Sequence, residues 1–360
     1  MKQVLIAGAS GLVGRGAVRA FGSDCQVVAT ARHAPEGVGN VRFVAADLCD
    51  AQACRTIFSQ FDGVTHLVFT ALYEKEGGLL ASWLDPEQIA TNDAMLKNLF
   101  EPLSAVARNL KHVTLLQGTK AYGAHVRPIP LPAREDRDEL KSQPNFYWNQ
   151  EDYLRAKQRG QEWSFTIIRP QIIFGDALGA AMNPVAAFGL YGALLKERGE
   201  KLHFPGGAGN VFEGVDADLI GRAIRWAGEA DAARNHAFNI TNGDVMVWKN
   251  VWPAIADALG MQVGEDRPTL LARDLPPRAG EWDQIRRKYG LAAPDLMAFA
   301  GKSLDYVDLL MSGDAARPPF LVSTIKLRRA GFTEMLDSEV MLRNAIAALQ
   351  ARKLLPPRAG

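Results

Sequence analysis

The chain has 360 residues, 48% of them hydrophobic, and its 41 basic and 40 acidic side chains leave a net charge of +1. A chain of this length can bury a large core and exceeds one average domain, so two lobes are expected. The balanced charge, without a long run of one sign, argues against nucleic acid as a partner. The longest apolar run, 177–195, is interrupted by Asn183, Pro184 and several glycines, which argues against a membrane span.

The cysteines and the N-terminus predict a reducing compartment. Cys25, Cys49 and Cys54 are odd in number, lie among apolar residues and lack the spacing of a metal site. A strand begins at once at the N-terminus, with no basic-then-apolar leader before it. We therefore expect a soluble, cytoplasmic protein without a bound metal.

The stretch from Val4 to Gly14 reads Val-Leu-Ile-Ala-Gly-Ala-Ser-Gly-Leu-Val-Gly and is typical of dinucleotide binding. Its apolar residues predict a short buried strand, and an amphipathic helix is predicted to begin near Gly11. Gly8 permits a tight turn, Gly11 lets the backbone approach a pyrophosphate, and Gly14 lets the helix pack closely on the sheet. The first amides of that helix favour an anion at the same place. The alternative is a strand, turn and helix with a purely structural role.

A second strand is predicted over 26–31, and the residues at its end bear on the choice of cofactor. In folds that prefer NAD, an acidic residue here holds the ribose 2′-hydroxyl. This chain reads Ala-Thr-Ala-Arg-His over 29–33, without a carboxylate. The guanidinium of Arg32 would instead pair with a 2′-phosphate, which favours NADP(H) over NAD(H). A solvated loop residue is the alternative interpretation of Arg32.

Strands and helices continue to alternate through the first half, which predicts right-handed crossovers and a parallel sheet. A strand over 41–45 ends just before Asp47, which can contact an adenine ring or cap the next helix. His66 lies inside an apolar strand over 64–71, and we expect a core histidine with satisfied hydrogen bonds. The later elements predicted in this half are a helix over 93–110, a strand over 112–117, a long loop over 124–144, a helix over 145–161 and a strand over 165–170.

We expect the chain to divide after residue 170. Residues 1–170 would form an NADP(H)-binding domain of the α/β class, a Rossmann-type doubly wound parallel sheet. Residues 171–360 would form a smaller C-terminal substrate lobe, partly interleaved with the first domain. This second half is expected to contain a strand over 237–240 and a Trp-containing segment over 248–259.

The apolar run 177–195 is a candidate wall of the substrate pocket, and an ordinary buried helix is the alternative. Its large side chains are Met182, Phe188 and Tyr191. Trp248 and Trp252 are four residues apart, and we expect them to pack in the core rather than to contact a ligand.

Two pairs of residues compete for the role that a nicotinamide enzyme requires of its protein, the handling of charge that develops on oxygen. Tyr153 and Lys157 have the Tyr-x-x-x-Lys spacing of short-chain dehydrogenases, which places both side chains on one helical face. Lys120 and Tyr147 form the second pair. Lys120 follows a strand at the carboxyl edge, where ligands bind in doubly wound sheets, and Tyr147 lies in the first turn of the next helix. This placement favours Lys120 and Tyr147.

Several segments carry a resemblance to a known family, and they are 117–123, 145–152 (Asn-Phe-Tyr-Trp-x-x-Glu-Asp), 168–175, 204–206, 216–220 and 238–244. These segments resemble the progesterone 5β-reductase/iridoid synthase-like (PRISE) family of extended short-chain dehydrogenases/reductases. The resemblance covers nearly the whole chain, and Asn-Phe-Tyr is its most specific marker. It implies NADPH-dependent reduction of activated carbon–carbon double bonds in enones and enals. It also implies that Lys120 and Tyr147 are the catalytic lysine and tyrosine, and that Tyr153 and Lys157 are incidental.

The chain departs from the family pattern around the predicted lysine. Gln117 and Ala121 replace the threonine and histidine of Thr-Gly-x-Lys-His-Tyr, and Gly-Ala-His over 123–125 replaces Gly-Pro-Phe. Trp148 replaces a frequent second tyrosine, which leaves Tyr147 as the only phenol in its motif.

The predicted reaction adds a hydride to the β-carbon of a small-molecule enone, and Tyr147 and Lys120 stabilise the enolate that forms. The residues predicted to contact NADPH or NADP+ are Gly8, Ser10, Gly11, Leu12, Val13, Gly14, Arg32, His33, Asp47, Leu48, Thr70, Ala71, Gln117, Lys120, Tyr147 and Ile172. One alternative is an extended short-chain dehydrogenase or epimerase that acts on a carbonyl or nucleotide-sugar through Tyr153 and Lys157. Another is a module that binds NADPH without turnover. A homodimer through helices that flank the sheet is possible by analogy of fold.

Overall fold

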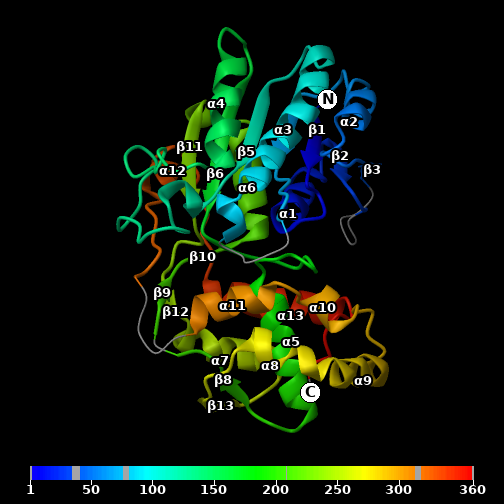
Figure 1. Ribbon diagram of the computed structural model, residues 1–360, viewed down its shortest axis with the longest axis vertical. Coiled ribbons are helices and arrows are strands. Elements are labelled where there is room, and N and C mark those ends of the chain that lie inside the picture. Colours follow the sequence, from blue (N-terminus) through cyan, green and yellow to red (C-terminus); the bar gives the residue numbers. More distant parts are fainter. Residues whose placement is uncertain (1, 35–40, 76–80, 208, 313–317, 359–360) are drawn as a thin grey trace. The chain divides into compact units, whose positions relative to one another are not determined.

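The computed structural model describes residues 2–34, 41–75, 81–207, 209–312 and 318–358, and the chain separates into two compact units (Figure 1). The first unit comprises Met1–Gln171, Ala217–Ile240 and Val322–Glu334, and the second comprises Ile172–Asp216, Thr241–Leu321 and Met335–Gly360. The chain first leaves the first unit after Gln171, one residue past the division that the sequence predicts, and it returns twice.

The first unit contains a seven-stranded parallel sheet in the order β11-β6-β5-β4-β1-β2-β3. Its strands are β1 (Gln3–Ala7), β2 (Gln26–Ala31), β3 (Arg42–Ala45), β4 (His66–Phe69), β5 (His112–Leu116), β6 (Ser164–Pro170) and β11 (His236–Ile240). The strand order reverses between β1 and β4. In doubly wound sheets, ligands bind beyond the carboxyl ends of the strands at such a point. The predicted Rossmann-type sheet is therefore confirmed.

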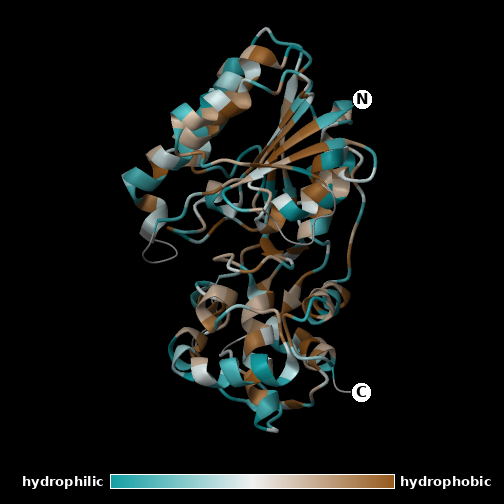
Figure 2. Cartoon of the chain, turned by 90° about the vertical axis from the view of Figure 1, so that its right-hand side faces the viewer, coloured by the Kyte–Doolittle hydropathy of each residue, from teal (hydrophilic) through white to brown (hydrophobic). Residues whose placement is uncertain are grey.

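Helices cover both faces of this sheet, so its strands are almost wholly apolar, as the brown ribbons of Figure 2 show. Helices α2, α3 and α4 pack side by side, and α1 packs against α6. The helices of the first unit are α1 (Leu12–Phe21), α2 (Ala51–Phe58), α3 (Pro86–Val106), α4 (Phe146–Gln158), α6 (Ala217–Ala227) and α12 (Ile325–Arg329), with the 3₁₀-helices η1 (Ala81–Leu84), η2 (Thr119–Tyr122) and η3 (Asp231–Ala233). Within the described residues, no helix is both long and apolar enough to cross a membrane.

Helix α3 begins earlier than the predicted residue 93. The side chain of Asp85 accepts hydrogen bonds from the amides of Glu87 (2.8 Å) and Gln88 (3.3 Å), and Pro86 occupies the first helical position. An aspartate cap followed by proline is a strong start signal, because proline needs no amide partner there. The prediction was wrong because it followed the apolar pattern and not the cap.

Strand β11 belongs to the central sheet and not to the second lobe, where the sequence analysis placed it. It pairs with β6 in parallel, from His236 opposite Thr166 to Ile240 opposite Pro170. A parallel pair requires a crossover, and α6 supplies the helix. Residues 172–216, which lie in the second unit, separate β6 from α6 and hide this crossover in the sequence.

The second unit combines helices with three two-stranded sheets, which pair β10 with β7, β12 with β9 and β13 with β8. Its strands are β7 (Ile172–Phe174), β8 (Leu202–Phe204), β9 (Val211–Phe212), β10 (Gly214–Asp216), β12 (Met246–Val247) and β13 (Val263–Asp266). Its helices are α5 (Pro184–Glu197), α7 (Trp248–Leu259), α8 (Leu271–Asp274), α9 (Ala279–Tyr289), α10 (Leu296–Phe299), α11 (Ser303–Met311) and α13 (Ser338–Ala351), with the 3₁₀-helix η4 (Pro276–Arg278).

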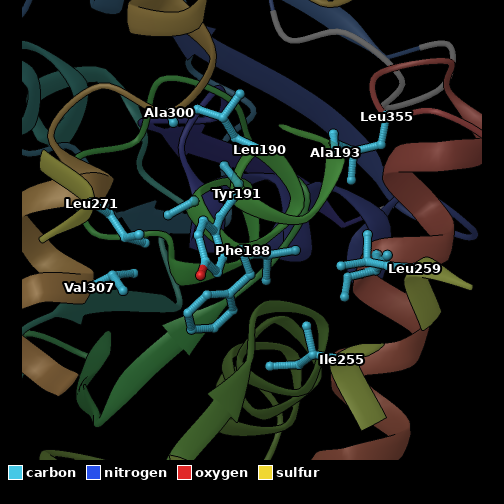
Figure 3. Packing of buried hydrophobic residues seen from close by; sticks show 14 of the residues in the cluster. Phe188, Leu190, Tyr191, Ala193, Ile255, Leu259, Leu271, Ala300, Val307 and Leu355 are labelled. Carbon is cyan, nitrogen blue, oxygen red and sulfur yellow. The ribbon is translucent and has the colours of Figure 1, made fainter. Parts of the chain in front are cut away.

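Helix α5 lies in the core of the second unit (Figure 3). The ring of Phe188 packs edge-on against Trp248 and Trp252, with centroids 5.2 and 5.5 Å apart, and Tyr191 also contacts Trp252. The core positions predicted for the two tryptophans are confirmed. Phe188 and Tyr191 are core residues as well, which fits the buried-helix alternative for this part of the run, and the pocket wall stays a prediction.

Helices α1 and α6 approach until their backbones touch. A Cβ atom added to Gly16 would lie 2.1 Å from the carbonyl oxygen of Ala217, and one added to Gly221 would lie 2.3 Å from the carbonyl oxygen of Gly16. Neither distance leaves room for a methyl group. These glycines set the spacing of the two helices, and α1 is also the helix that carries the glycine-rich turn at its start.

We therefore expect Gly16→Ala to destabilise the first unit by about 1–3 kcal/mol, the usual cost of overpacking a tight core. Gly280→Ala is the matched control, because a Cβ atom at this helical glycine of α9 would meet no atom within 4 Å. The midpoint of thermal unfolding should fall in Gly16→Ala and stay constant or rise in Gly280→Ala. Equal midpoints in the two variants would contradict this account.

Candidate functional site

The turn after β1 has the geometry that the glycines predict. Gly8 has a φ of +81°, which L side chains rarely adopt, and its amide donates a hydrogen bond to the carbonyl of Thr30 at 3.0 Å. A Cβ atom added to Gly14 would lie 2.1 Å from the carbonyl oxygen of Gly8. The tight turn at Gly8 and the close packing at Gly14 are confirmed, and the pyrophosphate contact of Gly11 stays a prediction.

The start of α1 fits an anionic group. Gly11 caps the helix without a side-chain hydrogen bond, so the first amides, those of Leu12 and Val13, have no capping side chain. Ser10 and Gly11 are exposed. Uncapped amides at a helix start carry partial positive charge and bind phosphate groups. A dinucleotide would place its pyrophosphate here.

The end of β4 lies against the same turn. The hydroxyl of Thr70 donates to the carbonyl of Ala7 at 2.8 Å, and a Cβ atom added to Gly8 would lie 2.6 Å from the amide nitrogen of Ala71. The predicted contacts Thr70 and Ala71 are thus brought together with Gly8 at the point where the strand order reverses.

The residues predicted to bind the adenosine half lie at the ends of β2 and β3. Arg32 and His33 are exposed just beyond β2, whose last residue is opposite Ala45 of β3. Asp47 is exposed and accepts a hydrogen bond from the amide of Cys49 at 3.0 Å.

The alternative role of Asp47 as a helix cap is wrong. Asp50 caps α2 through the amides of Gln52 and Ala53. Leu48, which lies between Asp47 and Asp50 in the sequence, is buried. The predicted contact Ile172 begins β7 and belongs to the second unit.

Lys120 and Tyr147 are brought together by a residue that the sequence analysis does not single out. The Nζ atom of Lys120, in η2, lies 3.9 Å from the ring centroid of Trp83. The ring of Tyr147, in the first turn of α4, packs edge-on against Trp83 with centroids 5.4 Å apart. The Tyr147 hydroxyl lies 3.3 Å from the position that a Cβ atom would take on Gly118, just past β5.

Asn145 connects the two segments. Its side-chain oxygen accepts the amide of Tyr147 at 3.0 Å, which caps α4, and its side-chain nitrogen donates to the carbonyl of Lys120 at 3.4 Å. Asparagine is a common residue before a helix, so its capping role was open to prediction from the sequence. Its contact with Lys120 was not.

The surroundings set the protonation states of the pair. Burial lowers the pKa of Lys120 to about 8, and the carboxylate of Glu74 opposes this change. Burial raises the pKa of Tyr147 above its usual range, Arg169 opposes the change, and Glu74 adds to it. At pH 7, Tyr147 is therefore a neutral phenol and a hydrogen-bond donor, and Lys120 carries a positive charge.

A fully buried guanidinium is connected to Tyr147 through Gln117. Arg169, at the end of β6, forms ion pairs with Glu139 (2.7 Å) and Glu151 (3.2 Å), and its Nε donates to the side-chain oxygen of Gln117 at 2.8 Å. The Gln117 side-chain nitrogen donates to the carbonyl of Tyr147 at 3.1 Å. Although burial works to raise it, the charge of Arg169 holds the pKa of Glu151 below its ordinary value.

This network changes the interpretation of Gln117. The side chain of Gln117 is buried, and its oxygen and nitrogen bind Arg169 and Tyr147, so the predicted contact of Gln117 with the cofactor stays a prediction. Gln117 therefore joins the end of β5 to the start of α4. Sequence reasoning missed Arg169 and Glu151, because their pairing depends on the tertiary approach of β6 and α4.

The competing pair lies at a different place. The Tyr153 hydroxyl donates to Glu101 of α3 at 2.8 Å, and the Lys157 amine lies 2.9 Å from the same carboxylate. Both side chains are thus engaged between α3 and α4, away from the contacts of Lys120 with Trp83.

His66 has the structural role that the sequence predicts. It is buried in β4, and its ring nitrogens lie 2.9 Å from the Thr65 hydroxyl and 3.3 Å from the Gly228 carbonyl. Across the parts of the chain that the structure describes, no three His, Cys, Asp or Glu side chains gather in a way that could hold a metal ion.

We expect Gln117→Leu to lower the free energy of unfolding by about 1–3 kcal/mol, because the substitution leaves the Nε of Arg169 and the carbonyl of Tyr147 without this partner in a buried place. Gln60→Leu is the control, since Gln60 is exposed in the turn that follows α2. The measurement is the midpoint of thermal unfolding. A midpoint of Gln117→Leu equal to that of Gln60→Leu would show that the hydrogen bonds of Gln117 do not stabilise the folded protein.

Known proteins resemble this chain over most of its length. The chain is 29% identical to (S)-8-oxocitronellyl enol synthase CYC2 of Camptotheca acuminata, over 98% of this chain and 93% of that protein. It is 30% identical to (S)-8-oxocitronellyl enol synthase ISY1 of Nepeta racemosa, over 88% of this chain and 81% of that protein. The fold resembles the crystal structure of the Bordetella bronchiseptica enzyme WbmH in complex with NAD+, with a TM-score of 0.65, 16% identity and coverage of 97% and 99% of the two chains.

A family model is decisive. The model of the PRISE-like Rossmann-fold domain matches residues 47–299, which is more than half of the chain. The two enol synthases named above match this chain over 93% and 81% of their own length. The chain therefore belongs to the PRISE-like Rossmann-fold family of oxidoreductases.

Proposed function

We propose that the protein uses NADPH to reduce activated carbon–carbon double bonds of small enones and enals. The observation that carries the proposal is the convergence of Lys120 and Tyr147 on one buried indole, at the carboxyl edge of the sheet and beside Gly118. The relatives named as enol synthases support the same chemistry.

The chain's residues suit the charge that this reaction develops. Bound NADPH would supply a hydride to the β-carbon of the enone. Tyr147 donates a hydrogen bond to the substrate's carbonyl oxygen, and this bond strengthens as the oxygen becomes an enolate. The raised pKa of Tyr147 keeps its proton in place, so it acts as a donor and not as a base. The nearby Lys120 ammonium adds positive charge on the same side.

The epimerase or carbonyl dehydrogenase alternative is disfavoured by the place of its pair. Tyr153 and Lys157 are both bound to Glu101 on the surface of α3. A catalytic tyrosine requires a hydroxyl that faces the reacting oxygen, and this hydroxyl instead donates to a carboxylate. A module that binds NADPH without turnover is excluded if the protein consumes NADPH with any enone.

We expect Tyr147→Phe to reduce kcat about 100- to 1,000-fold, the typical loss of one donor to a developing oxyanion. Tyr153→Phe is the matched control and should retain full activity. Both are measured as NADPH consumption, followed by absorbance, with a small enone. A Tyr147→Phe enzyme with near wild-type kcat, or a Tyr153→Phe enzyme with the larger loss, would transfer the role to the other tyrosine.

The cofactor preference is tested at Arg32, which is exposed at the end of β2. We expect Arg32→Ala to raise the KM for NADPH roughly tenfold, the equivalent of one charge-assisted hydrogen bond, and to leave the KM for NADH unchanged. Arg55→Ala, at an exposed position of α2, is the control for loss of a surface charge. An equal change in the KM for NADPH and for NADH would show that Arg32 does not contact the 2′-phosphate.

A further inference from the structure

We propose that Trp83 is a positioning residue for the Lys120–Tyr147 pair, which holds the lysine ammonium on its indole face and the tyrosine ring against its edge. The proposal rests on the proposed function for its effect on turnover. Its effect on Lys120 itself does not depend on that function. Trp83 lies in η1, between β4 and α3, and outside the motif segments that carry the family resemblance in the sequence.

The side chain of Trp83 contacts both Lys120 and Tyr147. Its side chain is 1% exposed. The Lys120 Nζ lies 3.9 Å from its ring centroid, well within the range of a cation–π contact. Tyr147 meets it at an interplanar angle of 73°, and Phe146 packs on it with centroids 4.9 Å apart. One residue therefore contacts both proposed catalytic side chains.

The indole ring can stabilise a buried ammonium group, which an aliphatic side chain cannot do. Removing an ammonium from water favours its neutral form, and the negative face of an aromatic ring offsets part of this cost. Trp83 thus stabilises the protonated form of Lys120 without supplying a carboxylate. A carboxylate in the same place would accept the hydrogen bond of Tyr147 in place of the substrate's oxygen.

Three described titratable groups act on this lysine or share its surroundings. Glu74 favours the ammonium, and Tyr147 remains a neutral phenol. Burial lowers the pKa of His125 to about 4, and the charge of Lys120 acts in the same direction. His125 also lies near Trp83, with ring centroids 6.4 Å apart. Near neutral pH His125 is uncharged, so between pH 7 and 9 the lysine is the group of this cluster that titrates.

The first experiment compares Trp83→Leu and Trp83→Phe by the pH dependence of kcat/KM. Leu keeps the surroundings apolar but removes the ring, so the basic limb of the profile should move down by roughly half to one pH unit. Phe retains a ring and should restore most of the wild-type profile. Trp226→Leu, which removes a half-buried indole of α6, should leave the profile unchanged. A profile of Trp83→Leu that overlies the wild type overturns the proposal.

A second measurement requires no turnover, and it reports on the wild-type indole directly. Protein labelled with 5-fluorotryptophan is titrated by ¹⁹F NMR, and the Trp83 signal is assigned by its loss in Trp83→Phe. This signal should move with a midpoint near pH 8, the pKa of Lys120, and should not move in Lys120→Met. A signal that ignores pH in the wild type, or one that still titrates in Lys120→Met, overturns the proposal. If the signal titrates as expected but no enone is reduced, the proposed function fails and the contact of Trp83 with Lys120 stands.

Discussion

A buried positive charge organises the site. The Arg169 guanidinium is fully buried, and an uncompensated charge in such a place is too costly to keep. It is paired by Glu139 from the long loop, by Glu151 from α4 and by the amide of Gln117 beyond β5. Three segments that are distant in the sequence are thereby held at one strand end. These pairs and the Asn145 cap hold the start of the helix that carries Tyr147 at this strand end.

This constraint links the fold to the chemistry. The reversal of strand order between β4 and β1 brings the glycine turn, Thr70 and Ala71 together. The network around Arg169 brings Tyr147 to the neighbouring strand end, and Trp83 places Lys120 beside it. The end of the parallel sheet is where a dinucleotide would bind, and under the proposed function side chains from loops and from one helix start would supply the reactive groups.

Local signals in the sequence predict the glycine-rich turn and the positions of several site residues. The other features of the site depend on long-range contacts. The positive φ of Gly8, the close packing of Gly14, the buried place of His66 and the first-turn position of Tyr147 each follow from a few neighbouring residues. Trp83 could not be predicted, because no period or motif distinguishes it from another core tryptophan. The role of Gln117 and the place of β11 in the sheet depend on partners 30 or more residues away, and neither has a local pattern. The start of α3 was predictable, since Asp85 followed by Pro86 is a capping residue followed by a proline at the first helical position.

The central claim is that the Tyr147 hydroxyl faces the oxygen on which negative charge develops. A crystal structure with NADP+ and a saturated ketone, which matches the reduced product and cannot accept a hydride at its β-carbon, tests this claim most directly. The account predicts that the ketone oxygen lies within roughly 3 Å of the Tyr147 hydroxyl, the distance of an O–H···O hydrogen bond. It also predicts that the β-carbon faces the nicotinamide ring. A ketone bound with its oxygen turned away from Tyr147, or toward Tyr153, would contradict it.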